Sequence, residues 1–312
     1  MAANGDHLWI VDKQARVQRI DAATGEPRVE FQMPEWSLGK PTGVTAWTDG
    51  DGVEWGFVAD THYHRIMVYR ALEGNPAGEF ITSFGEYGQG DGQFIYPTDI
   101  AVLPTADGRT IARLYVSEYG GNDRISVFEP TAALAEATTA AAPLRFVTSF
   151  GAMGISTEPG VVEFRRPQSI AIDVARGRLI VADACNHRLG VLTLDGTLQK
   201  WIGEGGEMDL GDSQRPAEES SLFSYPYGLE LLDDGTVLVS EFGASRVRHI
   251  DPETGRGLGV YGRRGRGDGE LATPWGIAVI DRTAYVLDSG NNRVIGFERP
   301  DLIRQRLVEG TR

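Results

Sequence analysis

Short alternating runs of apolar and polar residues fill the chain, separated by Gly, Asp, Asn or Pro. The runs are four to seven residues long, which is typical of β-strands rather than of helices. Residues 97–150 show the pattern well, with the runs TDIAVL, RLYVSE, RISVFE and RFVTSF. The pattern therefore predicts an all-β protein in which the strands follow one another in groups of four.

One string recurs six times: a β-rich run, an acid, a short polar loop, an arginine and a second β-rich run. The acids lie 47 to 65 residues apart and are Asp12, Asp60, Glu118, Asp183, Glu241 and Asp288. A proline motif precedes five of the six copies and reads PTGV (41–44), PTDI (97–100), PQSI (167–170), PYGL (226–229) and PWGI (274–277). Repeats of about 40–50 residues with four strands each indicate propeller blades.

These strings, written P-x-G-[IV]-A, Y-V-x-D and N-x-R-[IV]-x-x-F, resemble NHL repeats over nearly the whole chain. We therefore predict a six-bladed β-propeller with four-stranded antiparallel blades, in one domain that covers residues 1–312. A blade cannot bury both of its faces alone, so neighbouring blades stack and close into a ring. The resemblance implies a protein that serves as an interaction platform.

Both ends of the chain depart from the repeat. The first unit has no proline motif, so blade 1 is expected to lack its inner strand. The tail, residues 301–312, is expected to form an outer strand of the last blade or a helical turn. We expect the natural chain to continue upstream of Met1 with the missing strand and a signal or anchor, which favours an extracytoplasmic location.

The long loops are expected to gather on one face. If the strands of a blade are called a to d from the centre outward, the b–c loops and the d–a connections share a face because strand direction alternates. Three long d–a segments fall at 85–96, 151–166 and 203–225, and long loops are usually functional or disordered. The other face has one insertion, 131–143, which we expect to be a short helix or a loop. Ligands are therefore expected on the b–c and d–a face.

The six acid–arginine pairs allow two interpretations. The acids could form a ring of carboxylates that binds cations, or each acid could bond to its own turn and to its arginine. Because the pair recurs in every blade whatever else varies, we favour the structural interpretation.

The residues that vary between blades are better candidates for a site. They lie in the b–c loops and just after the repeat prolines, at the expected channel mouth. The candidate ligand-binding residues are His62, Tyr63, Thr98, Asp99, Tyr119, Gln168, Asn186, Tyr227, Phe242 and Trp275. Aromatic side chains with a few polar groups suit a ligand pocket. The alternative is that the Tyr and Trp side chains wedge between blades.

Metal sites are considered from the same loops. Zinc would require three or four of His62, His64, Cys185 and His187 to converge. Calcium would require the repeat acids together with Asn122, Asn186 or Asn291. Neither set is favoured, so no cofactor is expected, with calcium or zinc as the alternative.

Composition and charge exclude some classes of partner and of structure. Glycine accounts for 40 of 312 residues, and much of it lies in the loops that join blades. The formal charge of −14 argues against a nucleic-acid partner, because phosphate binding needs a basic surface. One cysteine excludes an internal disulfide framework, and no apolar run reaches the ~18 residues of a membrane span. We expect a monomer.

Three functions are compatible with these features. The first is a non-catalytic module that binds a small molecule, glycan or protein segment at the channel mouth, favoured because the strings G-x-S-x-G and H-E-x-x-H are absent. The second is a metal-dependent lactonase- or lyase-like enzyme, with Asp99, His62, Tyr119 and His187 around calcium or zinc. The third is a purely structural or docking domain.

Overall fold

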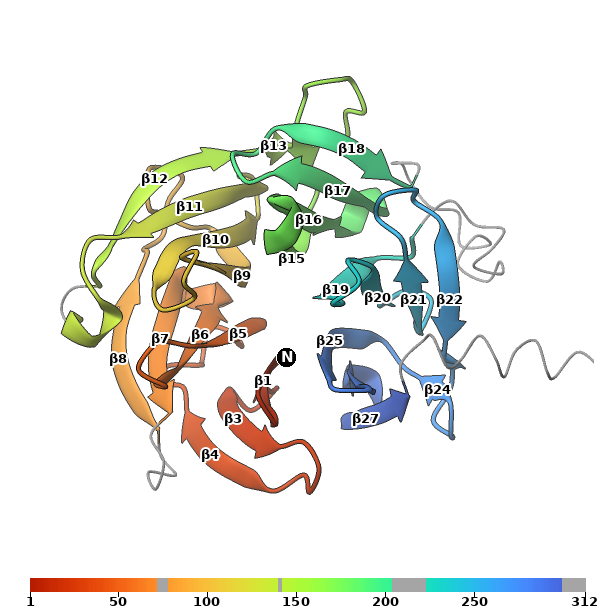
Figure 1. Ribbon diagram of the computed structural model, residues 1–312, viewed down its shortest axis with the longest axis horizontal. Helices are drawn as coiled ribbons and strands as arrows, with labels where there is room; N and C mark the ends of the chain where they lie inside the picture. Colours follow the sequence, from red (N-terminus) through yellow and green to blue (C-terminus); the bar gives the residue numbers. More distant parts are fainter. Residues whose placement is uncertain (72–77, 140–141, 204–222, 299–312) are drawn as a thin grey trace, which may run out of the picture. The chain divides into compact units, whose positions relative to one another are not determined.

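Each blade is an antiparallel sheet in which neighbouring strands are also neighbours in the sequence. The computed structural model describes residues 1–71, 78–139, 142–203 and 223–298, where strands and short 3₁₀ turns form nearly all regular structure (Figure 1). The chain divides into two units, Met1–Met153 and Gly154–Arg312, with three blades each. The predicted fold class, an all-β protein with six propeller blades, is confirmed.

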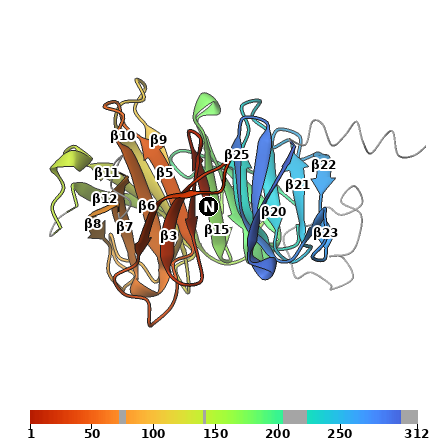
Figure 2. The ribbon, with the colours of Figure 1, turned by 90° about the horizontal axis from the view of Figure 1, so that it is seen from below.

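Unit 1 contains blades 1 to 3, whose strands run alongside one another (red to yellow in Figure 2). Its strands are β1 (Ala2–Asn4), β2 (His7–Val11), β3 (Arg16–Asp21) and β4 (Pro27–Gln32); β5 (Gly43–Thr48), β6 (Glu54–Asp60), β7 (Arg65–Ala71) and β8 (Glu79–Phe84); β9 (Tyr96–Pro104), β10 (Ile111–Tyr119), β11 (Arg124–Pro130) and β12 (Leu144–Phe150).

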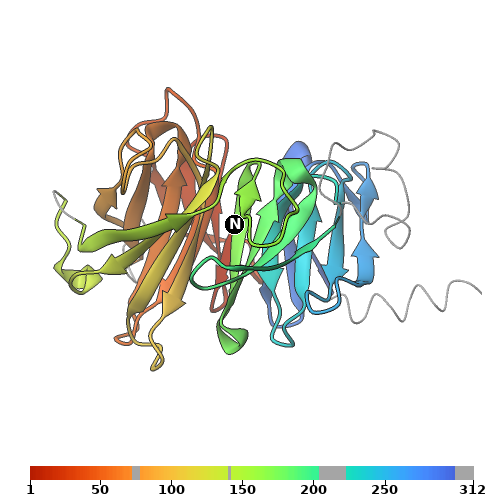
Figure 3. The same ribbon diagram turned by 90° about the horizontal axis from the view of Figure 1, so that it is seen from above.

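Unit 2 contains blades 4 to 6 (green to blue in Figure 3). Its strands are β15 (Pro167–Asp173), β16 (Arg178–Asp183), β17 (Arg188–Thr193) and β18 (Leu198–Ile202); β19 (Pro226–Leu231), β20 (Val237–Glu241), β21 (Arg246–Ile250) and β22 (Gly257–Tyr261); β25 (Pro274–Ile280), β26 (Thr283–Asp288) and β27 (Arg293–Glu298). The connections carry four two-residue strands, β13 (Ala152–Met153), β14 (Glu163–Phe164), β23 (Arg263–Arg264) and β24 (Glu270–Leu271).

Blade 1 does have an inner strand, so the prediction that it is missing is wrong. The strand β1 pairs antiparallel with β2, and Ala2 lies opposite Trp9. The strand β1 lacks the proline motif and is only three residues long, so the sequence gives no sign of it. It is held by backbone hydrogen bonds to β2, which residues other than proline can form. In the last blade the structure describes three strands, and the tail 301–312 lies outside the described residues.

The insertions are described only in part. Within 131–143 the structure places a 3₁₀ turn at Leu134–Glu136, while residues 140–141 lie outside the described residues. Residues 204–222 of the long 203–225 segment also lie outside them. No helix in the described part of the chain is both long and apolar enough to span a membrane.

The core consists of apolar layers between successive blades. In β6, Trp55 and Phe57 face blade 3, whereas Val58 faces blade 1, so both surfaces of the strand are buried. Separate layers join blades 4 and 5 and blades 5 and 6 in unit 2. This two-sided burial is the physical reason that a blade needs neighbours.

The small residue of the proline motif lets adjacent inner strands approach each other. A Cβ on Gly43 would lie 2.1 Å from the carbonyl oxygen of Thr98 in the next blade, and one on Gly228 would lie 2.6 Å from that of Trp275. Both distances are far below van der Waals contact. Glycine at these two positions is therefore required by packing.

The repeat acids hold the loops in place, as the structural interpretation predicts. In blades 3 to 6 each carboxylate accepts a hydrogen bond from the backbone N–H two residues before the repeat proline, at 2.6–2.7 Å. The donors are Ile95, Arg165, Ser224 and Ala272. In all six blades the acid also forms an ion pair with its arginine.

The arginines bind the other end of the same loops. Arg124 donates to the carbonyl oxygens of Gln89, Gly90 and Gln93, and Arg293 donates in the same way to residues 266, 267 and 270. The b–c loops and the d–a connections therefore lie together within each unit, as predicted. We call this side of each unit the loop edge.

Candidate functional site

The first candidate region lies on the loop edge of unit 1, where histidine and tyrosine side chains meet. His62 and Tyr63 belong to the 3₁₀ turn Thr61–Tyr63 between β6 and β7, and His64 ends that turn in the left-handed conformation at φ 58°. The His62 and His64 rings both lie 5.8 Å from the ring of Tyr96, and Tyr119 lies 5.1 Å from Tyr96. The structure thus brings together three of the predicted site residues, His62, Tyr63 and Tyr119.

A preceding loop extends this region with exposed side chains that sequence reasoning missed. Trp36 is 47% exposed and Leu38 is 69% exposed. From the connection after blade 2, Tyr87 is 69% exposed and its ring lies 4.8 Å from His64. The sequence feature that could have indicated them is the presence of large apolar residues within the polar loop PEWSLGK (34–40). We call the full set the aromatic surface: Trp36, Leu38, His62, Tyr63, His64, Tyr87, Tyr96 and Tyr119.

Polar contacts fix the shape of the aromatic surface. The Tyr63 hydroxyl lies 3.2 Å from the Ser37 hydroxyl and accepts a hydrogen bond of 3.2 Å from the backbone N–H of Leu38. These two bonds lower the pKa of Tyr63. Glu35 forms an ion pair of 2.8 Å with Arg65. The loop 34–40 is therefore tied to the b–c loop of blade 2.

Thr98 and Asp99 lie on β9, shortly after Tyr96 of the aromatic surface. Thr98 is buried, and its hydroxyl lies 2.8 Å from that of Ser117 on the adjacent strand. The hydroxyl of Thr42 donates to the Thr98 carbonyl oxygen at 3.3 Å, which links blades 2 and 3. Asp99 is half-buried. Thr98 therefore has a packing role whatever its part in binding.

The second candidate region lies on the loop edge of unit 2 and contains Tyr227, Phe242 and Trp275. The Tyr227 ring stacks on Phe242 at 4.6 Å and meets the edge of Trp275 at 4.8 Å. Tyr227 is buried, whereas the other two rings are half-buried. Tyr227 therefore wedges between blades 5 and 6, and Phe242 and Trp275 keep accessible area.

Polar groups from blade 4 lie beside these rings. The Arg166 guanidinium lies 5.4 Å from the Tyr227 ring and donates a hydrogen bond of 3.0 Å to the buried amide of Gln168. The structure thus brings the predicted residue Gln168 to the same rings. Nearby, His187 accepts a hydrogen bond of 3.3 Å from the backbone N–H of Tyr225, and burial lowers its pKa.

Asn186, another predicted site residue, is fully buried. Its amide donates bonds of 2.8 Å to the Asp183 carboxylate and to the Gly154 carbonyl oxygen. Asn291 and Asn122 bond in the same way to Asp288 and Glu118. In each case the amide N–H donates to the acid. A calcium ion shared by the two side chains would instead be bound by the amide oxygen and the carboxylate together.

The zinc set is divided between the units, with His62 and His64 in unit 1 and Cys185 and His187 in unit 2. Within the described ranges, no three His, Cys, Asp or Glu side chains gather in a way that could hold a metal ion. The His187 nitrogen Nδ1 already accepts the N–H of Tyr225.

Comparison with known proteins identifies the repeat. Residues 164–192, which include β15, β16 and most of β17, match the NHL repeat. This chain contains an NHL repeat within a six-bladed β-propeller fold. The resemblance predicted from the proline and acid–arginine strings is therefore confirmed.

Among curated proteins, this chain is similar to Protein brain tumor of Drosophila melanogaster. The two are 27% identical over 154 residues, which is 49% of this chain. The match spans only 12% of the relative's length.

Solved structures share the fold. The virginiamycin B lyase of Staphylococcus aureus, crystallised as an inactive variant with quinupristin, superposes with a TM-score of 0.52 at 14% identity, covering 97% of this chain and 84% of the lyase chain. A chain of a nidogen/laminin complex gives a TM-score of 0.58 at 16% identity, covering 94% of this chain and 89% of that chain. At these identities the likeness is one of fold alone.

Proposed function

We propose that this NHL-repeat propeller is a non-catalytic binding module that holds a segment of a protein partner on the aromatic surface of unit 1. A propeller of this kind supports a binding or interaction role in general. The observation that carries the finer proposal is the exposure of Trp36, Leu38 and Tyr87 on one edge. Clustered exposed apolar side chains mark interaction sites, and Trp and Tyr dominate binding energy at protein interfaces.

The anchoring of the loop supports this role. Burial of apolar area stabilises a fold by about 25 cal/mol per Å². Because Trp36 and Leu38 leave much of their area exposed, packing within the fold does not explain these two residues. The bonds of Tyr63 to Ser37 and Leu38 hold the loop before a partner arrives. Because the surface is already ordered, binding loses less conformational entropy.

The degree of exposure favours a protein segment over a small molecule or glycan. Small molecules are enclosed by concave pockets that bury most of their surface. Side chains that are about half to two-thirds exposed instead offer contact across an open face. The rim is polar, with Lys40 lying 4.0 Å over the Trp36 ring and Glu35 paired with Arg65, as at other protein interfaces.

Site-specific photo-crosslinking tests the proposal. A photoreactive phenylalanine at position 38 is expected to give a discrete adduct in an extract of the source cells. The matched control is position 174, because Val174 is also an exposed apolar residue but lies in unit 2 between β15 and β16. Adding Trp36→Ala should reduce the adduct at position 38 several-fold. Equal labelling at both positions, or none at position 38, would contradict the proposal.

The metal-dependent lyase or lactonase stays a second hypothesis. Three of its candidate residues, His62, Asp99 and Tyr119, lie in unit 1, whereas His187 lies in unit 2. The likeness to virginiamycin B lyase concerns the fold and transfers no catalytic residue. Elemental analysis of the purified protein separates the hypotheses, since stoichiometric calcium or zinc would favour the enzyme.

We also propose a monomer that acts outside the cytoplasm. Size-exclusion chromatography with light scattering tests the first statement. Fractionation of the source cells with an antibody against this chain tests the second.

A further inference from the structure

The loop edge of unit 2 carries arginines that form no ion pair with a carboxylate among the described residues. Two short stretches, 163–166 and 262–274, contain five arginines and three acids in a chain of formal charge −14. Arg165, Arg264 and Arg266 are exposed and form no ion pair with any described residue. Of the acids, Glu270 is bonded to Arg263 and to the N–H groups of residues 266 and 267.

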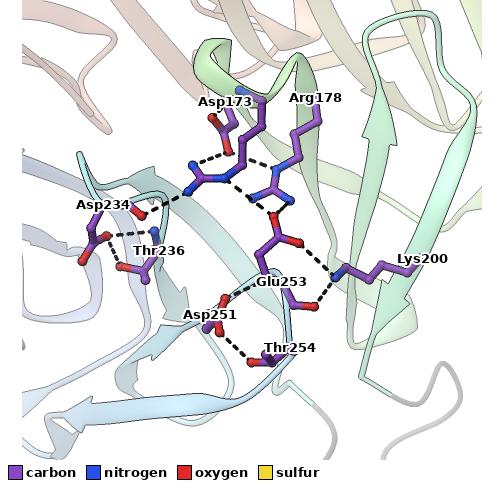
Figure 4. Close-up of polar contacts among 9 residues, drawn as sticks. Asp173, Arg178, Lys200, Asp234, Thr236, Asp251, Glu253 and Thr254 are labelled. Atoms are coloured by element: carbon purple, nitrogen blue, oxygen red, sulfur yellow. Dashed lines mark hydrogen bonds and ion pairs between the residues drawn. The ribbon is translucent and has the colours of Figure 1, made fainter.

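The other edge of unit 2 shows the contrast. There Arg178 donates to Asp173 at 3.0 Å and also binds Glu253, and Arg176 lies 3.2 Å from Asp173 (Figure 4). Lys200 approaches the Glu253 carboxylate to 3.9 Å. Every cation of that network has an acid against it, so its charge is used within the fold.

Backbone and ring contacts connect the segments that carry these arginines. The carbonyl oxygen of Arg165 accepts the N–H of Cys185, and the charge of Arg165 acts on His187. The ring of His187 lies 4.4 Å from that of Tyr225. Tyr225 accepts the N–H of Phe242 at its carbonyl, and Arg264 donates to the carbonyl of Gly243 at 3.1 Å.

The same set of contacts includes an accessible aromatic side chain. Tyr225 is 40% exposed and has the left-handed φ of 50°, which is unusual for a bulky residue. The backbone of Tyr225 is held by its N–H, which donates to His187, and by its carbonyl oxygen, which accepts the N–H of Phe242. Arg166 and Thr273, which also precede repeat prolines, have the same positive φ, so this conformation belongs to the repeat, and the exposure of the Tyr225 ring is what distinguishes this position.

From this juxtaposition we propose that Arg165, Tyr225 and Arg264 form a second binding surface, which recognises an extended peptide segment rich in Asp and Glu. The guanidinium groups bind carboxylates with two parallel N–H···O bonds, and Tyr225 packs against an intervening apolar or aromatic side chain. The half-buried rings of Phe242 and Trp275 extend the apolar part of this surface.

A peptide fits this arrangement better than a nucleic acid. A few single arginines together with an exposed aromatic ring suit the mixed acidic and apolar side chains of a peptide. A nucleic acid presents a charge at every phosphate and would need a continuous basic track. The net charge of −14 also repels a polyanion more strongly than it repels a peptide with a few carboxylates.

Fluorescence anisotropy with the full chain tests the proposal. The probe is a labelled peptide in which glutamate alternates with tyrosine and glycine, compared with the same peptide carrying glutamine in place of glutamate. We expect the glutamate peptide to bind and the double variant Arg165→Gln/Arg264→Gln to weaken binding by about tenfold or more. Arg282→Gln is the matched control, because Arg282 is an exposed arginine in the turn between β25 and β26 on the other edge.

The outcomes decide the proposal. Weakening by the double variant, with Arg282→Gln and Trp36→Ala unchanged and thermal melting preserved, supports it and separates it from the unit 1 surface. It is overturned if the glutamate peptide does not bind, if the glutamine peptide binds equally, or if the double variant binds like the parent. Tighter binding of a single-stranded oligouridine probe that the double variant abolishes would also overturn it in favour of RNA.

Discussion

The repeat acids and arginines show that one pair of residue types has different energetic roles at different depths. Asp183 and Arg188 are both fully buried, and the Arg188 guanidinium also lies 3.5 Å from the Trp201 ring. Asp12 and Arg16 form the same pair at a partly exposed position. The same two residue types therefore form a buried ion pair in blade 4 and a partly exposed ion pair in blade 1.

We expect Asp183→Asn to lower the free energy of unfolding by about 3–5 kcal/mol, because it leaves a buried arginine without its counter-charge. Asp12→Asn should cost about 1 kcal/mol or less, since water screens the exposed arginine. Urea denaturation of both variants measures the difference. Equal losses in the two variants would show that burial does not set the role of the pair.

Glu230 on β19 makes stability depend on pH. Burial raises the pKa of Glu230 to about 8, and the hydrogen bond of 3.1 Å from the N–H of Val279 acts in the opposite direction. The folded pKa lies above the ordinary value of 4.5, so the folded state holds the proton between these pH values. The stabilising contribution is present below pH ~4.5 and is lost as the pH rises through about 8.

We expect Glu230→Gln to remove this dependence, because the amide oxygen still accepts the Val279 N–H. The variant should gain up to about 5 kcal/mol over the parent between pH 5 and pH 9, since the pKa of Glu230 rises from 4.5 to about 8 on folding. Denaturant unfolding across that range measures the effect. Glu158→Gln, an exposed loop variant of the same unit, serves as control, and an equal gain there would contradict the assignment to Glu230.

At the scale of elements, strands and connecting loops are coupled by the acid–arginine pairs. Arg124 lies at the start of β11 and holds three carbonyl oxygens of the 85–96 connection, while Glu118 at the end of β10 holds the N–H of Ile95. The connection also has bonds of its own, in which the N–H of Phe94 donates to the carbonyl oxygen of Glu86 at 2.8 Å and that of Gly88 donates to the carbonyl oxygen of Phe94 at 3.1 Å. Its order therefore rests on these bonds together with those to β10 and β11.

We expect Arg124→Ala to increase amide hydrogen exchange in residues 86–95 by about tenfold or more, because local opening then breaks fewer bonds. Arg113→Ala is the control, since Arg113 pairs with Glu129 in the same blade without contacting this connection. Exchange measured by mass spectrometry reports both. Unchanged protection in Arg124→Ala would mean that the connection holds its own shape.

At the scale of the whole molecule, apolar layers between blades and ion pairs within them account for stability in both units. We therefore expect a chelator to leave the melting temperature unchanged within about 2 °C, whereas loss of a structural metal costs folding energy outright. Calorimetry before and after dialysis against EDTA measures this. A clear fall that calcium or zinc restores would contradict it and would favour the enzyme hypothesis.

Much of the fold follows from particular residues. The alternating runs predict the strands, because alternate side chains of a strand face opposite blades and both faces must be buried. The proline motifs predict the inner strands of five blades. The strand β1 was missed because three residues carry no periodicity that could be counted.

The site was predicted less completely. His62, Tyr63 and Tyr119 were singled out because they vary among otherwise similar loops, and the structure brings them together. Trp36, Leu38 and Tyr87 were missed, because the sequence does not show which apolar residues of a loop remain exposed. Ligand binding by any of these residues stays a prediction.

The sequence alone determined the blades, the loop edge and the structural role of the acid–arginine pairs, because these depend on local periodicity and on repetition. Only the tertiary structure decided which side chains remain accessible. Tyr227 is buried while Tyr225, two residues earlier, is exposed. Arg165 forms no ion pair in the part of the chain that the structure describes, whereas Arg188 is paired with Asp183. Exposure and pairing depend on residues far away in the chain, which no local pattern records.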